Sequence, residues 1–231
     1  MDRLVAALVL LLVPLAAGAH GGSHAQADAS ASAEAKAADE GVPSLGYELP
    51  VAGSYELPPI LHVEEHALLG SDGERATILA LEPGQLAIVS FVYLGCRDPA
   101  GCPLALATLV RPDRALAARA DLAPRVRLVS VSFDPRHDRP GDLARLREGL
   151  SPQSDWRFFT AEGEPDLAPV LADFGQNVDV IPGEDGETPA LGHVLKVFLV
   201  DARGRVRNVY STGFLDHRLL VRDIETLLAE E

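Results

Sequence analysis

The segment from Ile88 to Leu106 constrains the fold of this chain more than any other stretch. It opens with an apolar run rich in β-branched and aromatic residues, Ile88 to Leu94, which lies between two glycines. Such a run predicts a buried strand. Cys96 follows the strand, and Cys102 stands directly before Pro103, a residue type favoured in the first turn of a helix. The sequence therefore places both cysteines of the chain on one strand–loop–helix corner.

A thiol at the start of a helix lies near unpaired backbone N–H groups and the positive end of the helix dipole. Both favour the thiolate, which is the form that binds metals and attacks disulfides. We therefore expect Cys102 to have thiolate character.

The rest of the chain predicts alternating strands and helices. Further strands are expected at Val126–Phe133, Trp156–Phe159, Val194–Asp201 and Val206–Tyr210. Helices are expected at Leu104–Ala120, Asp138–Leu150, Glu164–Phe174 and Asp216–Glu230. This order predicts an α/β fold with a central mixed sheet flanked by helices, thioredoxin-like in outline. The first two strong strands should be parallel and joined by a right-handed crossover.

The sequence also makes five local predictions. Pro112 should kink or break the first helix, and Asp138 is a candidate helix N-cap. Tyr55–Leu57 is expected to form a short edge strand, and an N-terminal hairpin should bend at the turn Ser71–Glu74. Asn177–Leu191 reads as a long acidic loop of the functional or mobile kind.

The N-terminal 19 residues resemble a secretory signal peptide, with a positive residue, an apolar core and small residues at the cleavage position. Residues 20–50 read as a disordered Ala/Ser-rich linker, and residues 51–231 as the folded domain. The apolar run is shorter than the roughly 20 residues of a spanning helix. We therefore expect an exported, periplasmic protein, anchored to the membrane if the leader is not cleaved.

Two histidines of the linker are a minor metal candidate. Cleavage after Ala19 would make His20 the new N-terminus, with His24 close by. The amine and two imidazoles could hold copper weakly, and a solvated tail that contains His is the alternative.

The formal net charge of −14 argues against a nucleic-acid partner, which would need a basic face. Two cysteines are too few for a disulfide-rich scaffold but suffice for a single pair.

A third side chain is expected to join the two thiols. In a thioredoxin-like fold, the first helix corner faces the loop before the closing hairpin, and here that loop ends at His193. Soft thiolates select Cu(I) or zinc, and imidazole suits copper or zinc. Structural zinc normally has four closed ligands. Two cysteines and one histidine therefore predict an open metal site.

Three segments, in order, resemble the Sco/SenC family of thioredoxin-fold copper proteins. They are FVYLGCRDPAGCPLA, VSFDPRHDRPGDL and GHVLKVFLVDARGRV, and the resemblance covers roughly Leu86 to Leu228. It implies copper, as Cu(I) or Cu(II), bound by Cys96, Cys102 and His193. Asp134, in the second segment, becomes a candidate for a role beside the ligands or in docking a partner. The family has three residues between its cysteines, and this chain has five.

The resemblance also implies a function. A metallochaperone of this kind would deliver copper to a respiratory enzyme such as the dinuclear centre of cytochrome c oxidase, in its subunit II. Members are also credited with thiol–disulfide reduction, so an oxidoreductase that uses Cys96 and Cys102 is the first alternative, with a thiol–disulfide reductant as partner. A structural disulfide in an exported binding module is the second. We expect a monomer in each case.

Overall fold

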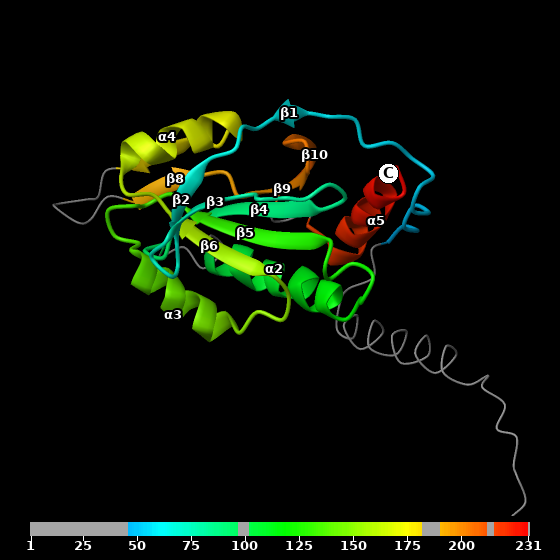
Figure 1. The fold of residues 1–231 in the computed structure, drawn as a ribbon, viewed down its shortest axis with the longest axis horizontal. Coiled ribbons are helices and arrows are strands. Elements are labelled where there is room, and N and C mark those ends of the chain that lie inside the picture. Colours follow the sequence, from blue (N-terminus) through cyan, green and yellow to red (C-terminus); the bar gives the residue numbers. More distant parts are fainter. Residues whose placement is uncertain (1–45, 97–101, 182–189, 212–214, 231) are drawn as a thin grey trace, which may run out of the picture.

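The computed structural model describes residues 46–96, 102–181, 190–211 and 215–230. Within these ranges the chain forms an eight-stranded mixed sheet with helices on both faces (Figure 1). Its strands, in spatial order, are β1 (Leu61–His62), β10 (Arg205–Ser211), β9 (Lys196–Asp201), β4 (Leu86–Val92), β5 (Val126–Ser132), β6 (Trp156–Thr160), β2 (Ala67–Gly70) and β3 (Arg75–Thr77). The helices are α2 (Cys102–Ala117), α3 (Pro140–Leu150), α4 (Glu164–Asp173) and α5 (His217–Leu228). The predicted fold class is confirmed.

Strand β4 is the centre of the architecture. All 7 of its residues are buried, as expected for an apolar run that is covered on both faces. It pairs parallel with β5 and antiparallel with β9, and β5 pairs parallel with β6. The predicted parallel pair is therefore confirmed. The carboxyl ends of β4, β5 and β6 meet at one edge, where ligand sites of open α/β sheets lie.

Two hydrophobic clusters fill the layers on either side of the sheet. One cluster holds the apolar side chains of α4, including Leu167, Val170 and the following Phe174. The other holds the inward side chains of α2, α3 and α5. In Figure 1, α4 accordingly lies on one side of the sheet, and α2 and α3 lie on the other.

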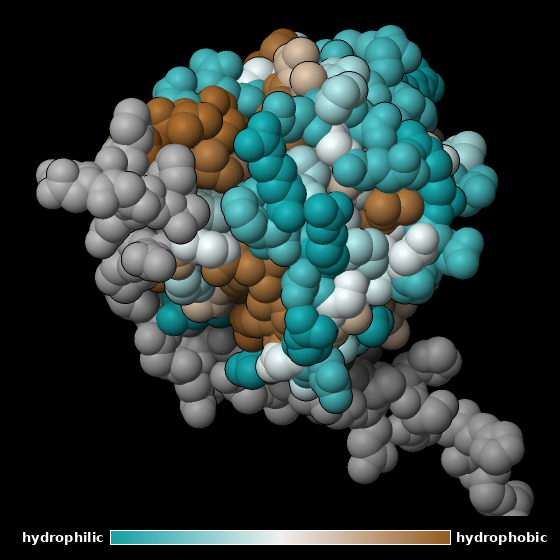
Figure 2. Space-filling model, turned by 90° about the vertical axis from the view of Figure 1, so that its left-hand side faces the viewer, coloured by the Kyte–Doolittle hydropathy of each residue, from teal (hydrophilic) through white to brown (hydrophobic). Residues whose placement is uncertain are grey.

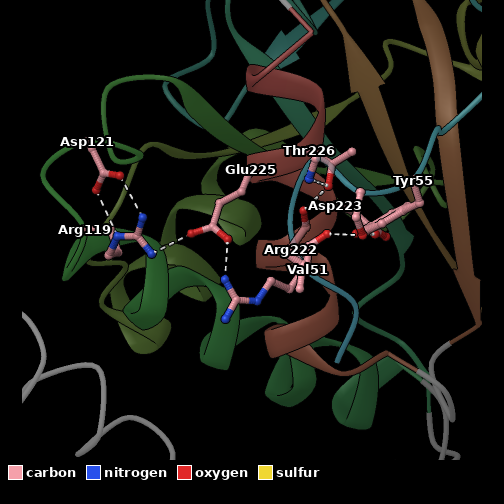
Figure 3. Close-up of polar contacts among 10 residues, drawn as sticks. Val51, Tyr55, Arg119, Asp121, Arg222, Asp223, Glu225 and Thr226 are labelled. Carbon is pink, nitrogen blue, oxygen red and sulfur yellow. Dashed lines mark hydrogen bonds and ion pairs between the residues drawn. The ribbon is translucent and has the colours of Figure 1, made fainter. Parts of the chain in front are cut away.

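The predicted N-terminal hairpin is present but extends the main sheet. Strands β2 and β3 pair antiparallel, and β2 also pairs with β6. The expected edge strand at Tyr55–Leu57 is wrong, because these residues are not in a strand and the edge position belongs to β1. The Tyr55 hydroxyl instead donates to Asp223 Oδ1 of α5 at 2.5 Å, and the Gly53 N–H donates to Thr226 (Figure 3). Side-chain anchoring to a helix therefore replaces strand pairing here.

The expected break in the first helix is also wrong. Helix α2 is continuous from Cys102 to Ala117, with Pro112 inside it. Pro112 is buried, and the next residue, Asp113, accepts hydrogen bonds from the backbone N–H groups of Gln153 and Ser154. Tertiary packing thus outweighs the local cost of the proline.

The segment predicted as a loop, Asn177–Leu191, contains strand residues at both of its ends. Strands β7 (Val178–Ile181) and β8 (Ala190–His193) pair antiparallel in a separate two-stranded sheet. The residues from Asp179 to Ile181 are exposed, so the segment lacks the buried apolar pattern that would have signalled a strand.

No helix in the described ranges is long and apolar enough to cross a membrane. The predicted signal peptide, most of the linker, and His20 and His24 lie outside the described residues.

Candidate metal centre

The two cysteines meet at the carboxyl end of β4. Both carry thiols, and the Cys96 side chain hydrogen-bonds to the Cys102 side chain. Cys102 is the first residue of α2, as predicted, and its Sγ accepts the backbone N–H of Tyr93 at 3.4 Å. Cys102 is buried, whereas Cys96 is partly exposed. The corner therefore presents one accessible and one buried sulfur in contact.

The expected thiolate character of Cys102 is not what the structure supports. Burial raises the pKa of the Cys102 thiol to about 12, the Tyr93 N–H opposes the rise, and the neighbouring Cys96 adds to it. Removing a thiolate from water costs more than the helix start can return. Cys102 is therefore a protonated thiol at neutral pH until a metal or an oxidant replaces its proton.

Tyr93 contacts all three predicted ligands. Its backbone N–H bonds Cys102, its hydroxyl hydrogen-bonds the Cys96 side chain, and its ring centroid lies 6.3 Å from that of His193. Burial, followed by the Cys96 contact, raises the pKa of the Tyr93 hydroxyl. A neutral, buried tyrosine thus links the thiols to the histidine.

His193 is the last residue of β8, paired with Val178, and packs against Phe133 with ring centroids 4.3 Å apart. Burial lowers the pKa of its imidazole, although a hydrogen bond to the Leu191 backbone opposes this. Nε2 is buried and has no hydrogen-bond partner, so the Leu191 contact belongs to Nδ1. Histidine metal ligands are typically neutral imidazoles with one ring nitrogen hydrogen-bonded and the other available to the metal, and His193 has this arrangement.

The three predicted ligands share one neighbourhood but are not assembled around a point. Cys96 and Cys102 are in contact, and His193 reaches their common neighbour Tyr93. In the ranges that the structure describes, no group of three or more His, Cys, Asp or Glu side chains is close enough to hold a metal ion. The donor types nevertheless fit a soft cation, because two contacting thiols and an imidazole nitrogen without a hydrogen-bond partner are ligands that such a cation prefers.

Asp134 lies at the same edge but bonds elsewhere. Both of its carboxylate oxygens are 2.9 Å from Nδ1 of His137, whose side chain is exposed. Asp134 directly follows Phe133, the residue that packs on His193. Its role beside the ligands or in docking remains a prediction.

Asp138 has a role that the sequence did not reveal. The predicted helix cap is wrong, because the N-cap of α3 is Arg139. The Asp138 carboxylate is buried and accepts hydrogen bonds from the Leu94 N–H at 3.0 Å and the Ser132 hydroxyl at 2.6 Å. Leu94 lies 44 residues away in the sequence, so no local pattern could have found this contact.

The end of the sheet that carries the site also exposes apolar side chains. Figure 2 views this end of the molecule, and hydrophobic patches are visible between hydrophilic ones. Large exposed hydrophobic residues from the elements at this end are Leu94, Leu104, Val180, Ile181 and Val194.

A contacting pair of thiols at the first helix corner of a thioredoxin-like fold defines a protein of thiol redox or soft-metal chemistry. The chain belongs to the SCO1/SenC family, whose family model matches residues 58–229. A comparison with curated proteins gave no match.

Solved structures of this family have the same fold. ScoI of Bradyrhizobium japonicum with copper bound is 20% identical, with a TM-score of 0.57 over 73% of this chain and 98% of that chain. A SCO1/SenC family lipoprotein of Bacillus anthracis is 23% identical, with a TM-score of 0.63 over 76% and 99%. BsSco, a member of the Sco family of cytochrome c oxidase assembly proteins with an identified disulfide switch, is 20% identical, with a TM-score of 0.61 over 77% and 100%.

Proposed function

We propose that this protein is an exported copper metallochaperone that carries copper on Cys96, Cys102 and His193. The observation that carries the proposal is the buried Nε2 of His193, which has no hydrogen-bond partner, in a side chain that shares its neighbour Tyr93 with a contacting pair of thiols. A buried polar atom without a partner is unfavourable in a folded protein and needs an explanation. A bound cation supplies one.

The residues have distinct parts in holding the cargo. Cys96 is the accessible sulfur and therefore the first to meet an incoming ion or an acceptor. Cys102 must release its proton on binding, so that copper uptake liberates a proton at neutral pH. His193 is already neutral and needs no deprotonation. A site with few protein ligands and one exposed sulfur can both take up copper and release it.

The relatives support the cargo and the acceptor class. The Bradyrhizobium protein holds copper, and BsSco belongs to a group of cytochrome c oxidase assembly proteins. We propose a respiratory copper enzyme of this kind as acceptor, with Asp134 at the docking face. Export, from the leader at residues 1–19 to the periplasm, agrees with the lipoprotein relative. We also propose that the protein is a monomer.

An anaerobic copper titration of the reduced protein tests the proposal. Wild type, Cys96→Ser and His193→Ala are compared, with His137→Ala as the control because His137 is exposed and bonded to Asp134. We expect one tight equivalent of copper in wild type and in His137→Ala. Cys96→Ser should lose tight binding, and His193→Ala should weaken it. Equal binding by all four proteins would contradict the proposed site.

The contact between the two sulfurs also favours a second candidate, a thiol–disulfide oxidoreductase. In that case Cys96 would attack, because Cys102 is buried and its pKa is raised. Reduction of a protein disulfide by wild type, without any tight copper binding, would favour this candidate. Copper and a disulfide exclude each other at the same sulfurs, so the oxidised protein should bind no copper at this site.

A further inference from the structure

We propose that Asp138 is a positioning residue for the two thiols, acting through the backbone of Leu94 and Tyr93. Its carboxylate holds the peptide that leads into the cysteine corner. The copper readout of this inference rests on the proposed function, and its redox readout does not.

The backbone N–H groups of Tyr93 and Leu94, just before the cysteine corner, donate to side chains and not to a neighbouring strand. The Phe133 N–H donates to the Val92 carbonyl at 3.0 Å and closes the contact between the β4 and β5 segments. After it, the Tyr93 N–H donates to Cys102 Sγ, and the Leu94 N–H donates to Asp138 Oδ2. Leu94 lies in the turn that follows β4. The peptide that carries the Leu94 N–H begins at the carbonyl of Tyr93, so holding this N–H on Asp138 also restricts the backbone of Tyr93, whose own N–H bonds the sulfur.

The acceptor itself is held from several sides. Asp138 is 2% exposed, and its carboxylate also accepts the hydroxyl of Ser132 at the end of β5. Its backbone N–H donates to the Asp134 carbonyl at 2.9 Å, and the next residue, Arg139, is the N-cap of α3. The carboxylate is thus fixed by a strand, a turn and a helix start.

The surroundings of Asp138 disfavour the charged form of its carboxyl group. Burial raises the pKa of the carboxyl, and Asp134 and Asp142 raise it further. No described arginine, lysine or histidine forms an ion pair with it. A buried carboxyl without a cation is unfavourable unless its hydrogen bonds compensate. The hydrogen bonds from Leu94 and Ser132 therefore provide this compensation.

The position of Tyr93 transmits the effect to the whole site. Tyr93 contacts Cys102 through its backbone, Cys96 through its hydroxyl and His193 through its ring. A change in the Leu94 peptide would shift Tyr93, and Tyr93 touches all three predicted ligands. A small rotation at one peptide should therefore alter the sulfur geometry.

Asp113 offers a matched control. It too is a 2% exposed aspartate that accepts backbone N–H groups, at 2.9 Å from both Gln153 and Ser154, together with a serine hydroxyl. It lies on the second half of α2, away from Cys102. Asp113→Ala reports what the loss of a buried carboxylate does to stability alone.

The test measures the equilibrium between dithiol and disulfide in dithiothreitol redox buffers. Forming the Cys96–Cys102 disulfide releases two protons and two electrons, and oxidised dithiothreitol takes them up to become reduced. We expect Asp138→Ala to change the equilibrium constant about tenfold, which is about 30 mV for a two-electron couple. Asp138→Asn keeps an acceptor oxygen and should stay close to wild type, as should Asp113→Ala. The rate of copper dissociation should likewise change most in Asp138→Ala and stay close to wild type in Asp138→Asn and Asp113→Ala.

Thermal melts show which variants are folded. If Asp138→Ala does not fold, Asp138→Glu replaces it, because one added methylene moves the acceptor and should also change the equilibrium. An unchanged equilibrium in a folded Asp138→Ala or Asp138→Glu protein would overturn the inference. An Asp138→Asn shift as large as that of Asp138→Ala would overturn it as well. Absence of copper binding in wild type would contradict the proposed function alone, since the redox equilibrium still reports on Asp138.

Discussion

The two ends of the central sheet differ in how their buried polar groups are satisfied. At the α5 end, Asp223 accepts hydrogen bonds from Tyr55, Tyr210 and Asn208. Arg119 joins Asp121 and Glu225 at the same end (Figure 3). These contacts tie the segment that holds Tyr55, the last strand and the loop after α2 to the closing helix. The α5 end is built as a closed hydrogen-bond network.

At the site end, Asp138 is bonded, but other buried polar atoms of the described residues have no partner. Within the described ranges, the buried side-chain atoms without a partner are Thr160 Oγ1, Gln176 Oε1 and His193 Nε2. Thr160 ends β6, and His193 ends β8 in contact with Tyr93. Gln176 donates to the carbonyl of Val194, the residue after His193. From this comparison we infer that the α5 end provides stability, whereas the site end keeps polar groups available for a ligand. Four predictions test this division, from the largest expected loss of stability to the smallest.

Asp223→Ala should cause the largest loss. The partly buried Tyr55, the buried Tyr210 and the Asn208 amide would lose their common acceptor, at a cost of about 3–5 kcal/mol. Urea unfolding measures the loss, and the folded variant should still bind one equivalent of copper. Loss of copper binding in a folded Asp223→Ala protein would remove the distinction between the two ends.

Asp201→Asn should cost about 2–3 kcal/mol at pH 7, because the carboxylate bonds Arg205 and the buried Arg207. Burial raises the pKa of Asp201, but the hydrogen bonds from these arginines and the backbone outweigh it and lower the pKa below its usual value. The stabilisation is therefore present above the unfolded-state pKa of about 4 and is lost as pH falls through the lower folded-state pKa. Urea unfolding at pH 7 and pH 3 should show the gap between variant and wild type narrowing. A gap that stays constant with pH would contradict this assignment.

In contrast to Asp223→Ala, His193→Ala should lower copper affinity more than it lowers stability. Nε2 makes no hydrogen bond in the folded protein, so the main loss is the ring contact with Phe133, about 1 kcal/mol. Copper affinity should fall far more than stability does. A large loss of stability, on the scale of Asp223→Ala, would show that the imidazole is a structural residue.

Arg222→Ala should have the smallest effect. Its exposed pair with Glu225 on α5 spans three residues, and such pairs contribute about 0.3–0.5 kcal/mol. The variant is also the matched control for Asp223→Ala, since the two positions are neighbours on one helix. A loss above about 1 kcal/mol would mean that exposed pairs also stabilise the α5 end.

The sequence predicted the fold because its main strands and helices have clear patterns. The apolar run at β4, the proline after Cys102 and the apolar face of α5 each agree with the structure. Some of the wrong predictions concern positions whose structure depends on contacts with residues distant in the sequence. Pro112 is tolerated because Asp113 is anchored to a segment some forty residues on. The pairing of β7 with β8 was missed because most of the β7 side chains are exposed, so that the segment has no buried apolar pattern.

The three metal ligands stay a prediction, whereas the predicted thiolate chemistry of Cys102 is wrong. Cys96, Cys102 and His193 were identified from position and resemblance, and the structure brings the two cysteines into contact. The raised pKa of Cys102 follows from burial, which a helix-start argument does not include. Asp138 is predicted as a cap because the sequence shows only its local neighbours, whereas its partner Leu94 lies in the turn after β4.

X-ray absorption spectroscopy at the copper edge tests the central claim most directly. Copper-loaded wild type should show two sulfur neighbours and one nitrogen neighbour from imidazole. Cys96→Ser should keep one sulfur, and His193→Ala should lose the imidazole signal. A wild-type spectrum with fewer than two sulfurs, or an imidazole signal that persists in His193→Ala, would contradict a copper site formed by these three residues.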